Sequence, residues 1–282
     1  MSDSKQFAAR DDATAWCPGC GDFAILEAIK MALAESGLSP SKAVLVSGIG
    51  QAGKLPHYMR VNTFNTIHGR TLPTAAGIKL SNPELTVLTV GGDGDGYAEG
   101  GNHLLHALRR NLDMTVIVCD NRVFGLTKGQ ASPTSEQGRV GGITPAGTAY
   151  PDFNPLLLGI VMEAALVARG FSGEKEHLAD LVAQGINTPG LALIDILQPC
   201  VSFNKVNTWQ WYRQRVDKLE DHQPEDREKA MELARQWGDN IPLGVIYKSG
   251  RTSPTPTENL VTAELNPADV DKLLDQYRVN QT

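Results

Sequence analysis

The order of apolar and polar positions along the chain predicts strands that alternate with helices. Apolar runs with the length of buried strands lie at residues 43–50, 85–92, 114–121, 165–170 and 191–197. Segments with a helix-like spacing of apolar residues lie at 23–37, 71–80, 98–110, 154–164 and 174–186. Because apolar strands of this kind need helices on both faces of the sheet, the pattern predicts an α/β fold with a parallel sheet.

Composition and charge indicate an ordinary globular protein. Hydrophobic residues make up 41% of the 282 residues and the formal net charge is −6, which argues against disorder and against a nucleic-acid partner. The sequence has no signal peptide and no apolar run suited to a membrane span, so we expect no membrane contact and a cytoplasmic location. No Pro/Ser-rich linker is present. Residues 1–282 are therefore predicted to form a single domain, with residues from about 205 to 282 as a C-terminal extension.

A glycine-rich turn after the second predicted strand carries candidate ligands for a metal ion and a diphosphate. The turn is GDGDG at residues 92–96, in which Asp93 can bind a divalent cation while backbone amides at the next helix start face an anion. The following strand returns to the same sheet edge and delivers Asn121. One carboxylate and one amide oxygen suit Mg²⁺, because this ion usually fills its remaining coordination positions with phosphate and water oxygens. The P-loop pattern GxxxxGK[ST] is absent, which argues against a nucleotide site of that kind.

A segment of more than 30 residues follows Asn121 and reaches Pro155 with many glycines and prolines and little periodicity. Loops of this length are usually functional or disordered. Since this one begins at a candidate metal ligand, we expect a structured loop that wraps the cofactor and forms part of the substrate pocket.

The cysteines offer a second candidate metal site. Cys17 and Cys20 form a CxxC pair, whose spacing lets two thiolates reach one metal ion or one iron–sulfur cluster. On spacing alone, zinc, a redox dithiol and a cluster all remain open. Cys119 lies inside an apolar strand and is expected to be a small buried core residue.

Several segments together resemble the β subunit of 2-oxoacid:ferredoxin oxidoreductases, a family of thiamine-diphosphate enzymes. The GDGDG turn followed by Asn121 is similar to the diphosphate-binding signature of thiamine-diphosphate enzymes in general. The segments that narrow the resemblance are WCPGCGDFAI at 16–25, SGIGQAGKLPHY at 47–58, HGRTLP at 68–73, GNHLLHALRRN at 101–111, VFGLTKGQASPTSEQG at 123–138 and LQPCVSFN at 197–204. The resemblance covers roughly residues 14 to 206, far more than a short motif that recurs by chance.

The resemblance implies a role for individual residues. The Mg²⁺ ligands that it implies are Asp93, Asn121 and the Val123 carbonyl. The residues that it places around thiamine diphosphate are Ile49, Gly50, Gln51, Ala52, His68, Gly94, Asp95, Gly125 and Leu126. It puts Lys54 near the substrate carboxylate, with Lys128 as a second candidate for a charge-assisted contact. We take Lys54 and His68 as candidate catalytic residues, and we expect His68 to hydrogen-bond the diphosphate.

The same resemblance implies a [4Fe–4S] cluster. Three of the four cysteine positions of the family are present, at Cys17, Cys20 and Cys200. Where the family often has GIGC, this chain has Gln51. The alternatives are a cluster with one non-cysteine ligand, a ligand from another segment or a partner, or no cluster.

The activity implied by the resemblance is oxidative decarboxylation of a 2-oxoacid to an acyl-CoA and CO₂, with electrons passing to ferredoxin, or the reverse carboxylation. Lys54 and Lys128 favour 2-oxoglutarate, with pyruvate or broad specificity as alternatives. Thiamine enzymes also need an aminopyrimidine-binding domain, which this sequence lacks, so we expect an α subunit as an obligate partner. Trp209 and Trp211 are weak candidates for its contact surface.

Two other functions compete with this interpretation. The first is a non-redox, split-subunit 2-oxoacid decarboxylase in which the cysteines are structural, and absence of iron favours it. The second is a zinc-stabilised interaction protein that has kept a diphosphate-site scaffold without chemistry. Zinc in place of iron, together with no binding of thiamine diphosphate, favours that one.

Overall fold

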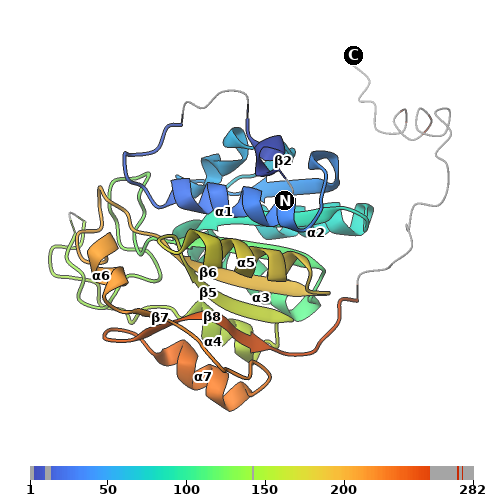
Figure 1. The fold of residues 1–282 in the computed structure, drawn as a ribbon. Helices are drawn as coiled ribbons and strands as arrows, with labels where there is room; N and C mark the ends of the chain where they lie inside the picture. The colour runs from blue at the N-terminus through green and yellow to red at the C-terminus, as the bar shows by residue number, and fades with distance from the viewer. Residues whose placement is uncertain (1–2, 10–13, 142, 255–271, 273–274, 276–282) are drawn as a thin grey trace.

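A single sheet runs through the centre of the structure, a computed structural model that describes residues 3–9, 14–141, 143–254, 272 and 275 (Figure 1). In the described part of the chain the sheet has eight strands. Their order across the sheet is β2 (Asn62–Asn65), β1 (Ala43–Ser47), β3 (Thr86–Gly92), β4 (Met114–Asp120), β6 (Leu191–Leu197), β5 (Leu166–Phe171), β8 (Ile241–Lys248) and β7 (Val216–Lys218).

Most of the sheet is parallel, which confirms the predicted fold class. All neighbouring pairs from β2 to β5 in the sheet run parallel. Between β2 and β6, a helix that packs on a face of the sheet connects each strand to the next strand in the chain. One difference from the prediction lies at the far edge, where β8 pairs antiparallel with β5 and parallel with β7. The sequence analysis predicted neither β8, β7 nor the short edge strand β2. Mixed sheets in which an antiparallel strand adjoins a parallel sheet near its edge are common.

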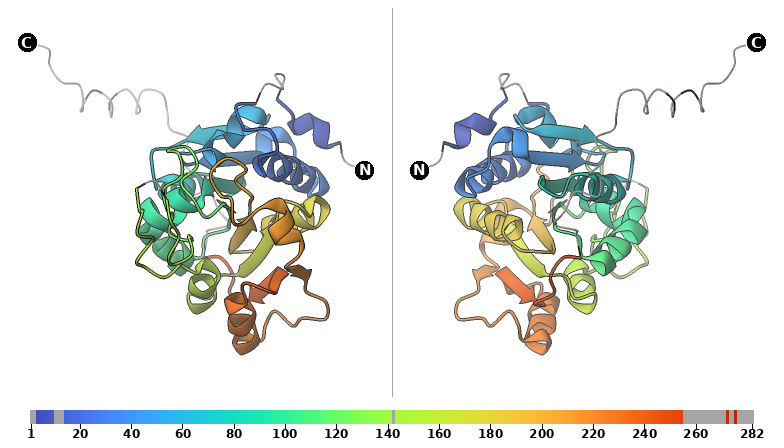
Figure 2. Two further views of the ribbon diagram at one scale, coloured as in Figure 1. Left: turned by 90° about the vertical axis from the view of Figure 1, so that its left-hand side faces the viewer. Right: turned by 90° about the vertical axis from the view of Figure 1, so that its right-hand side faces the viewer.

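Helices cover both faces of the sheet, as predicted (Figure 2). One face carries α1 (Asp22–Glu35) and α5 (Lys175–Ile186), which lie side by side in front of the sheet in Figure 1. The opposite face carries α2 (Thr71–Ser81), α3 (Gly101–Arg110), α4 (Pro155–Val161) and α7 (Arg227–Arg235), which share one apolar cluster.

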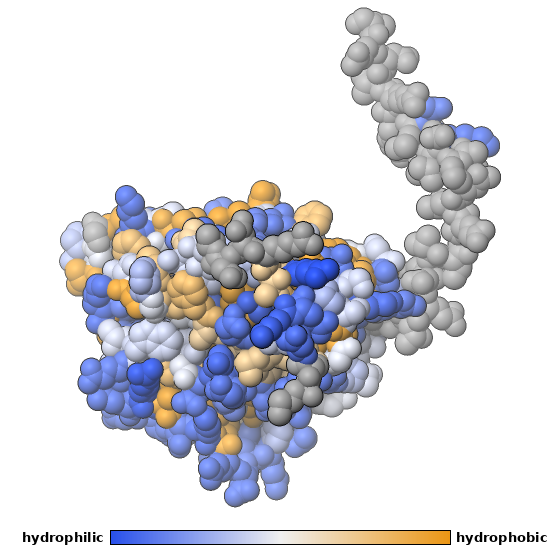
Figure 3. Space-filling model, turned by 45° about the horizontal axis from the view of Figure 1, so that its top comes forward, coloured by the Kyte–Doolittle hydropathy of each residue, from blue (hydrophilic) through white to orange (hydrophobic). Residues whose placement is uncertain are grey.

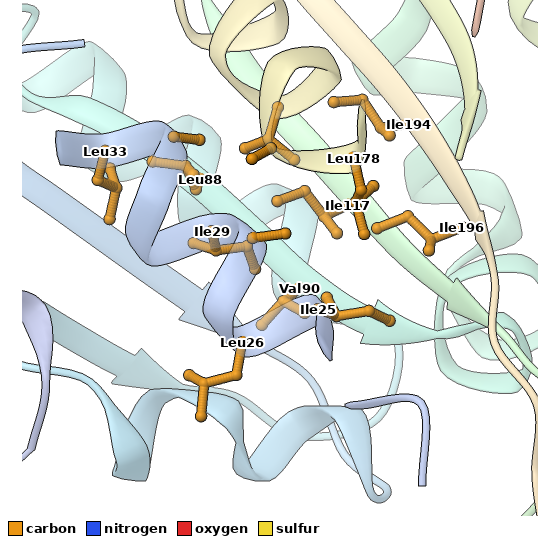
Figure 4. Packing of buried hydrophobic residues seen from close by; sticks show 14 of the residues in the cluster. Ile25, Leu26, Ile29, Leu33, Leu88, Val90, Ile117, Leu178, Ile194 and Ile196 are labelled. Atoms are coloured by element: carbon orange, nitrogen blue, oxygen red, sulfur yellow. The ribbon is translucent and has the colours of Figure 1, made fainter. Parts of the chain in front are cut away.

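The core follows from side chains that alternate between the two faces of each buried strand. On β3, Leu88 and Val90 point to the α1/α5 face, whereas Val87 points to the other face. Figure 4 shows the first of these layers, in which Ile25 and Ile29 of α1 face the strands. Both isoleucines are fully buried, and each such side chain contributes about 1.5–3 kcal/mol to folding. Cys119 is fully buried in the same cluster, as predicted for a core residue.

The remaining elements are short. They are the 3₁₀ helices η1 (Ser4–Phe7), η2 (Pro40–Lys42) and η3 (Ala52–Tyr58), the π-helical turn η4 (Gly94–Glu99) and the helix α6 (Trp209–Arg213). The helix predicted from residue 98 is thus two elements, because η4 already starts directly after Asp93 and α3 follows from Gly101. In the described part of residues 121–154 there is neither helix nor strand beyond one bridge between Phe124 and Gln130, which agrees with the predicted loop.

The aromatic residues after Cys200 pack on the chain's own sheet. Trp209 and Tyr212 contact the ring of Phe171 at the end of β5, and Trp211 contacts Trp237. This packing leaves Trp209 and Trp211 half-buried, so a partner surface that includes them stays a prediction. None of the helices in the described residues is long and apolar enough to cross a membrane. On the face displayed in Figure 3, apolar residues are scattered among polar ones.

Candidate active site

The carboxyl ends of four adjacent parallel strands create the candidate site. Strands β1, β3, β4 and β6 end next to each other, and each is followed by a segment that the sequence analysis singled out. In open α/β sheets, ligands bind just beyond the carboxyl ends of the strands, where the loops that follow several strands converge. Two pockets lie at this edge.

The first pocket brings together every residue that the sequence analysis placed around thiamine diphosphate. Its space measures about 540 Å³, including the open mouth. The lining residues are Ile49, Gly50, Gln51, Ala52, His68, Gly92, Asp93, Gly94, Asp95, Asn121, Val123, Phe124, Gly125, Leu126 and Thr127. The three implied Mg²⁺ ligands are therefore on the same wall as the implied cofactor contacts. We call this pocket the diphosphate pocket.

Asp93 is held by a hydroxyl group at the base of the diphosphate pocket. Its carboxylate is buried, and Thr134 Oγ1 lies 2.6 Å from Asp93 Oδ2 and 2.7 Å from Asp120 Oδ1. Burial raises the pKa of Asp93 well above its usual value, and the nearby Asp120 carboxylate raises it further. A cation at this wall would favour the charged form of Asp93, because an opposite charge offsets the cost of burying a carboxylate.

Asn121 and Val123 are fixed by a turn directly after β4. Asn121 Oδ1 accepts a hydrogen bond from the Val123 amide at 3.0 Å, and the Asn121 carbonyl accepts one from Asn204 Nδ2 at 3.0 Å. The amide oxygen keeps a second lone pair, so it can bind a metal ion without breaking this turn. The turn also leaves the Val123 side chain fully buried.

Asp95 joins two loops that border the diphosphate pocket to its own turn. Its Oδ1 accepts hydrogen bonds from the backbone amides of Gly69 at 3.0 Å and Ile49 at 3.3 Å, and His68 Nδ1 lies 3.5 Å away. Burial raises the pKa of Asp95. Its carboxylate thus positions the segments that carry Ile49 and His68, whereas the His68 side chain is 60% exposed at the pocket mouth.

The start of η4 offers a cradle for phosphate. The first amides of a helix have no partner within the helix and carry partial positive charge, and here they directly follow Asp93. Gly94 is required at this point, because a Cβ there would lie 2.3 Å from the ring of Phe124. The donor set therefore fits a magnesium diphosphate. No group of three His, Cys, Asp or Glu side chains that could hold a metal ion occurs in the described residues, but Mg²⁺ takes amide, carbonyl, phosphate and water oxygens.

The second pocket brings the predicted cysteines together. It measures about 370 Å³ including its mouth and lies against the diphosphate pocket. Its lining residues are Trp16, Cys17, Cys20, Asp22, Gln51, Asn121, Gly125, Gln198, Cys200, Val201, Ser202 and Phe203. Three of them, Gln51, Asn121 and Gly125, line both pockets, so one layer of residues separates the two. We call this second space the cysteine pocket.

Hydrogen-bond donors surround the sulfur atoms of the cysteine pocket. Gln198 Nε2 donates to Cys20 Sγ at 3.2 Å and Ser202 Oγ donates to Cys17 Sγ at 3.1 Å. Burial raises the pKa of Cys20, and the nearby Asp22 and Cys200 raise it further. An uncoordinated Cys20 is therefore a thiol, and a bound metal would be needed to hold it as thiolate. Donors to sulfur stabilise such thiolates, which fits a metal or iron–sulfur ligand set.

The two candidate substrate lysines flank the diphosphate pocket without lining it. Lys54 lies in η3, two residues after Ala52 of the wall. Burial raises the pKa of Asp22 to about 6, and the nearby positive charge of Lys54 offsets a small part of that rise. Lys128 is exposed and follows Thr127 of the wall. Neither lysine is among the residues that line the diphosphate pocket in this chain without a partner.

Sequence reasoning missed the residues that hold the ligands in place. Thr134, Gln198 and Ser202 contact Asp93, Cys20 and Cys17, respectively. Thr134 lies in the loop without periodicity, so no pattern pointed to it. Gln198 and Ser202 sit two residues before and after Cys200, and this proximity was the available signal.

Comparison with known families agrees with this geometry. The model of the C-terminal thiamine-pyrophosphate-binding domain of thiamine pyrophosphate enzymes matches residues 47–196, more than half of the chain. The model of the C-terminal part of the pyruvate ferredoxin oxidoreductase β subunit matches residues 200–263.

Individual relatives are similar over two thirds of the chain or more. The 2-oxoacid:ferredoxin oxidoreductase subunit beta of Saccharolobus solfataricus is 41% identical over 294 residues, covering 94% of this chain and 96% of that protein. The 2-oxoglutarate oxidoreductase subunit KorB of Mycobacterium tuberculosis is 44% identical over 194 residues, covering 69% of this chain and 52% of that protein.

A solved structure shows the same fold. It is the 2-oxoglutarate:ferredoxin oxidoreductase from Magnetococcus marinus with 2-oxoglutarate, coenzyme A and succinyl-CoA bound, and it matches with a TM-score of 0.87 and 36% identity. The match covers 99% of this chain and 97% of that chain. The predicted family is thereby confirmed, and the chain belongs to the β subunits of the CoA-acylating 2-oxoacid:ferredoxin oxidoreductases.

Proposed function

We propose that this β subunit supplies the magnesium and diphosphate half of an active site that converts 2-oxoglutarate and coenzyme A to succinyl-CoA and CO₂, or catalyses the reverse reaction. The observation that carries the proposal is the contact between the diphosphate pocket and the cysteine pocket through a single layer of residues. Such an arrangement lets electrons pass directly from the site of decarboxylation to a metal centre.

The residues of the diphosphate pocket divide into two tasks. Asp93, Asn121 and the Val123 carbonyl would hold Mg²⁺, while the first amides of η4 and His68 would bind the diphosphate. When bound, thiamine diphosphate supplies an electron sink for decarboxylation. Thr134 keeps Asp93 aimed at the cation, and Asp95 keeps the His68 loop in place.

We assign substrate recognition to the lysines at the pocket border. 2-Oxoglutarate carries two carboxylates, one of which pyruvate lacks. Lys54 and Lys128 would bind that additional carboxylate through charge-assisted contacts. The relatives named for 2-oxoglutarate support this choice of substrate.

We propose that the cysteine pocket holds a [4Fe–4S] cluster that passes electrons singly to ferredoxin. Cys17, Cys20 and Cys200 would each bind one iron, and ligands of separate irons need not converge on one point. The donors Gln198 and Ser202 would then stabilise the cluster sulfurs. All four cysteines are free thiols, which supports a reducing compartment such as the cytoplasm.

An α subunit would complete the site by supplying the aminopyrimidine-binding domain. Apolar side chains at both pocket mouths support a covering partner. Leu126 of the diphosphate pocket is 46% exposed, Phe203 of the cysteine pocket is 37% exposed, and Ile67 beside His68 is 72% exposed. Exposed apolar groups of this size around a polar site are typical of an interface core.

Metal analysis of the complex tests this function. We would co-purify the chain anaerobically with its α subunit, measure iron and acid-labile sulfide, and record an EPR spectrum after reduction with dithionite. We expect about four irons per αβ unit and a reduced-cluster signal that Cys200→Ala abolishes. Iron-free complex that still binds thiamine diphosphate would instead identify a non-redox decarboxylase, the alternative that Gln51 at a family cysteine position favours.

A further inference from the structure

Three oxygen atoms in the walls of the cysteine pocket are buried without a hydrogen-bond donor. They belong to the side chains of Asp22, Gln51 and Gln198, and among the described residues none of Asp22 Oδ1, Gln51 Oε1 and Gln198 Oε1 has a partner. A buried acceptor without a donor costs about 1–3 kcal/mol. Oxygen atoms gathered in this way around three thiols suggest a positively charged occupant.

Gln51 comes from a different segment of the chain than the cysteines of the cysteine pocket do. Cys17 and Cys20 precede α1 and Cys200 follows β6, whereas Gln51 follows β1. Its backbone is held in place, because Trp16 Nε1 donates to the Gln51 carbonyl at 2.9 Å and Lys54 N donates to the same oxygen at 3.2 Å. Gln51 also lines the diphosphate pocket, so its side chain stands between the two spaces.

The other two oxygen atoms are already tied to the cysteine side. Asp22 lies two residues after Cys20 and accepts a hydrogen bond from its thiol at 3.5 Å. Gln198 lies two residues before Cys200, and its amide nitrogen donates to Cys20 Sγ. A side chain that donates to one cluster ligand acts beside the cluster, whereas Gln51 has no such bond to a cysteine among the described contacts.

We propose that Gln51 Oε1 binds the fourth iron of the cluster, on the side that faces the diphosphate pocket. This inference rests on the proposed [4Fe–4S] function. Three cysteines leave one iron without a thiolate, and a neutral amide oxygen is a harder and weaker ligand than sulfur. The ligand set would also carry one negative charge less than four thiolates, which raises the reduction potential of the cluster.

A weakly bound iron has a chemical signature. One-electron oxidation of a [4Fe–4S]²⁺ cluster by ferricyanide gives the 3+ state, which can release one Fe²⁺ and leave a [3Fe–4S]⁺ cluster. The three-iron product is detected by its EPR signal in the oxidised protein, and the released Fe²⁺ is detected with a chelating dye. Neither readout depends on enzymatic activity.

The test compares three variant αβ complexes with the wild type after anaerobic purification. Gln51→Leu keeps the size of the side chain but removes the oxygen, and we expect it to release Fe²⁺ at least about tenfold faster than the wild type. Gln51→Cys adds a thiolate, so we expect release to slow by at least about tenfold and the midpoint potential to fall. Val201→Ala is the control in the same pocket, because Val201 lines it without a side-chain hydrogen bond to a thiol, and we expect its release rate to stay within about twofold of wild type.

Several outcomes would overturn the inference without touching the proposed function. Equal release from the wild type and Gln51→Leu shows that Gln51 does not bind iron. Acceleration as large in Val201→Ala as in Gln51→Leu shows that the effect comes from altered packing of the pocket and not from the lost oxygen. If Gln51→Leu fails to assemble, the Gln51→Cys complex still decides, because an unchanged potential and release rate contradict ligation at this position. Iron-free wild-type complex contradicts the cluster proposal itself.

Discussion

Thr134 supports two buried carboxylates at once. A hydroxyl has one hydrogen, so it can donate to only one of Asp93 and Asp120 at a time, although both lie within 2.7 Å of its oxygen. The other carboxylate then lacks this donor unless it carries a proton. A cation bound to Asp93 would relieve that conflict, because it would favour the charged form of the carboxylate.

Thr134→Val should weaken magnesium-dependent binding of thiamine diphosphate. The change removes a hydrogen bond to a charged group worth about 1.5–3 kcal/mol, which corresponds to a loss of about ten- to a hundredfold in affinity. Isothermal titration of the αβ complex with thiamine diphosphate and Mg²⁺ measures the effect. Thr134→Ser, which keeps the hydroxyl, is the matched control and should bind nearly as the wild type does. Equal affinities of the valine and serine variants would show that the hydroxyl does not position Asp93.

Lys54→Ala should raise the KM for 2-oxoglutarate more than the KM for pyruvate. The physical reason is the loss of a charge-assisted contact in a site that has to compensate two carboxylates rather than one. Steady-state kinetics with both substrates separates the effects. A change of equal size for both would mean that Lys54 binds only the shared carboxylate or has a structural role.

At the scale of elements, the turn from β3 into η4 determines the shape of the diphosphate pocket. Gly94→Ala would place a Cβ 2.3 Å from the Phe124 ring, so the ring and its loop would have to move. We expect the αβ complex of this variant to lose at least about tenfold in affinity for thiamine diphosphate, since a loop shift of this kind misplaces the Asn121 and Val123 ligands. Gly101→Ala is the matched control.

Gly101 is a suitable control because it is the first residue of α3 and has open space where a Cβ would lie. A Cβ at Gly101 meets no atom within 4 Å, and alanine favours a helix more than glycine does. Gly101→Ala should therefore bind the cofactor as the wild type does. Unchanged binding by Gly94→Ala, measured in the same titration, would show that contact between Gly94 and Phe124 does not shape the pocket.

Behind the site, strands β4, β5 and β6 share a buried polar network. Tyr97 Oη donates to Asp195 Oδ1 at 2.6 Å, and Arg169 lies near the same carboxylate. Burial, followed by the charge of Asp120, raises the pKa of Asp195 from 3.8 to about 7. The folded chain therefore holds a proton that the unfolded chain has released between these two pH values.

This network makes stability depend on pH in a defined direction. The contribution of Asp195 is fully present below its unfolded pKa and is lost as the pH rises through its folded pKa of about 7. We expect the Tm of the wild type, relative to Asp195→Asn, to fall between about pH 5 and pH 8, because asparagine does not titrate. Thermal scans of both proteins followed by circular dichroism measure this difference. A constant difference, or one that grows with pH, would contradict a proton on Asp195.

At the scale of the whole molecule, the sequence predicted the parts of the fold that have strong periodicity. The strands at β3, β4 and β6 are continuous apolar runs, and α1 and α5 have clear helical spacing, so all five were correct within a few residues. Strand β2, with four exposed residues, carries no apolar signal, and β7 and β8 depend on long-range pairing at the edge. Their positions follow from tertiary contacts that no local pattern encodes.

The sequence predicted the candidate ligands of the site but not the residues that support them. Asp93, Asn121 and the three cysteines stand in recognisable motifs, and the structure collects them in two adjoining pockets. Thr134 and Gln198 contact these ligands through side chains whose positions depend on how loops fold over the sheet edge. Lys54 and Lys128 flank the pocket, and an α subunit would have to bring the substrate to them.

Ferredoxin reduction by the assembled enzyme tests the account most directly. The αβ complex, purified anaerobically, is mixed with 2-oxoglutarate, coenzyme A and oxidised ferredoxin, and the absorbance of ferredoxin is followed. We predict reduction that requires both 2-oxoglutarate and coenzyme A and that disappears in Asp93→Ala. Release of CO₂ without ferredoxin reduction would contradict the account and identify a non-redox decarboxylase.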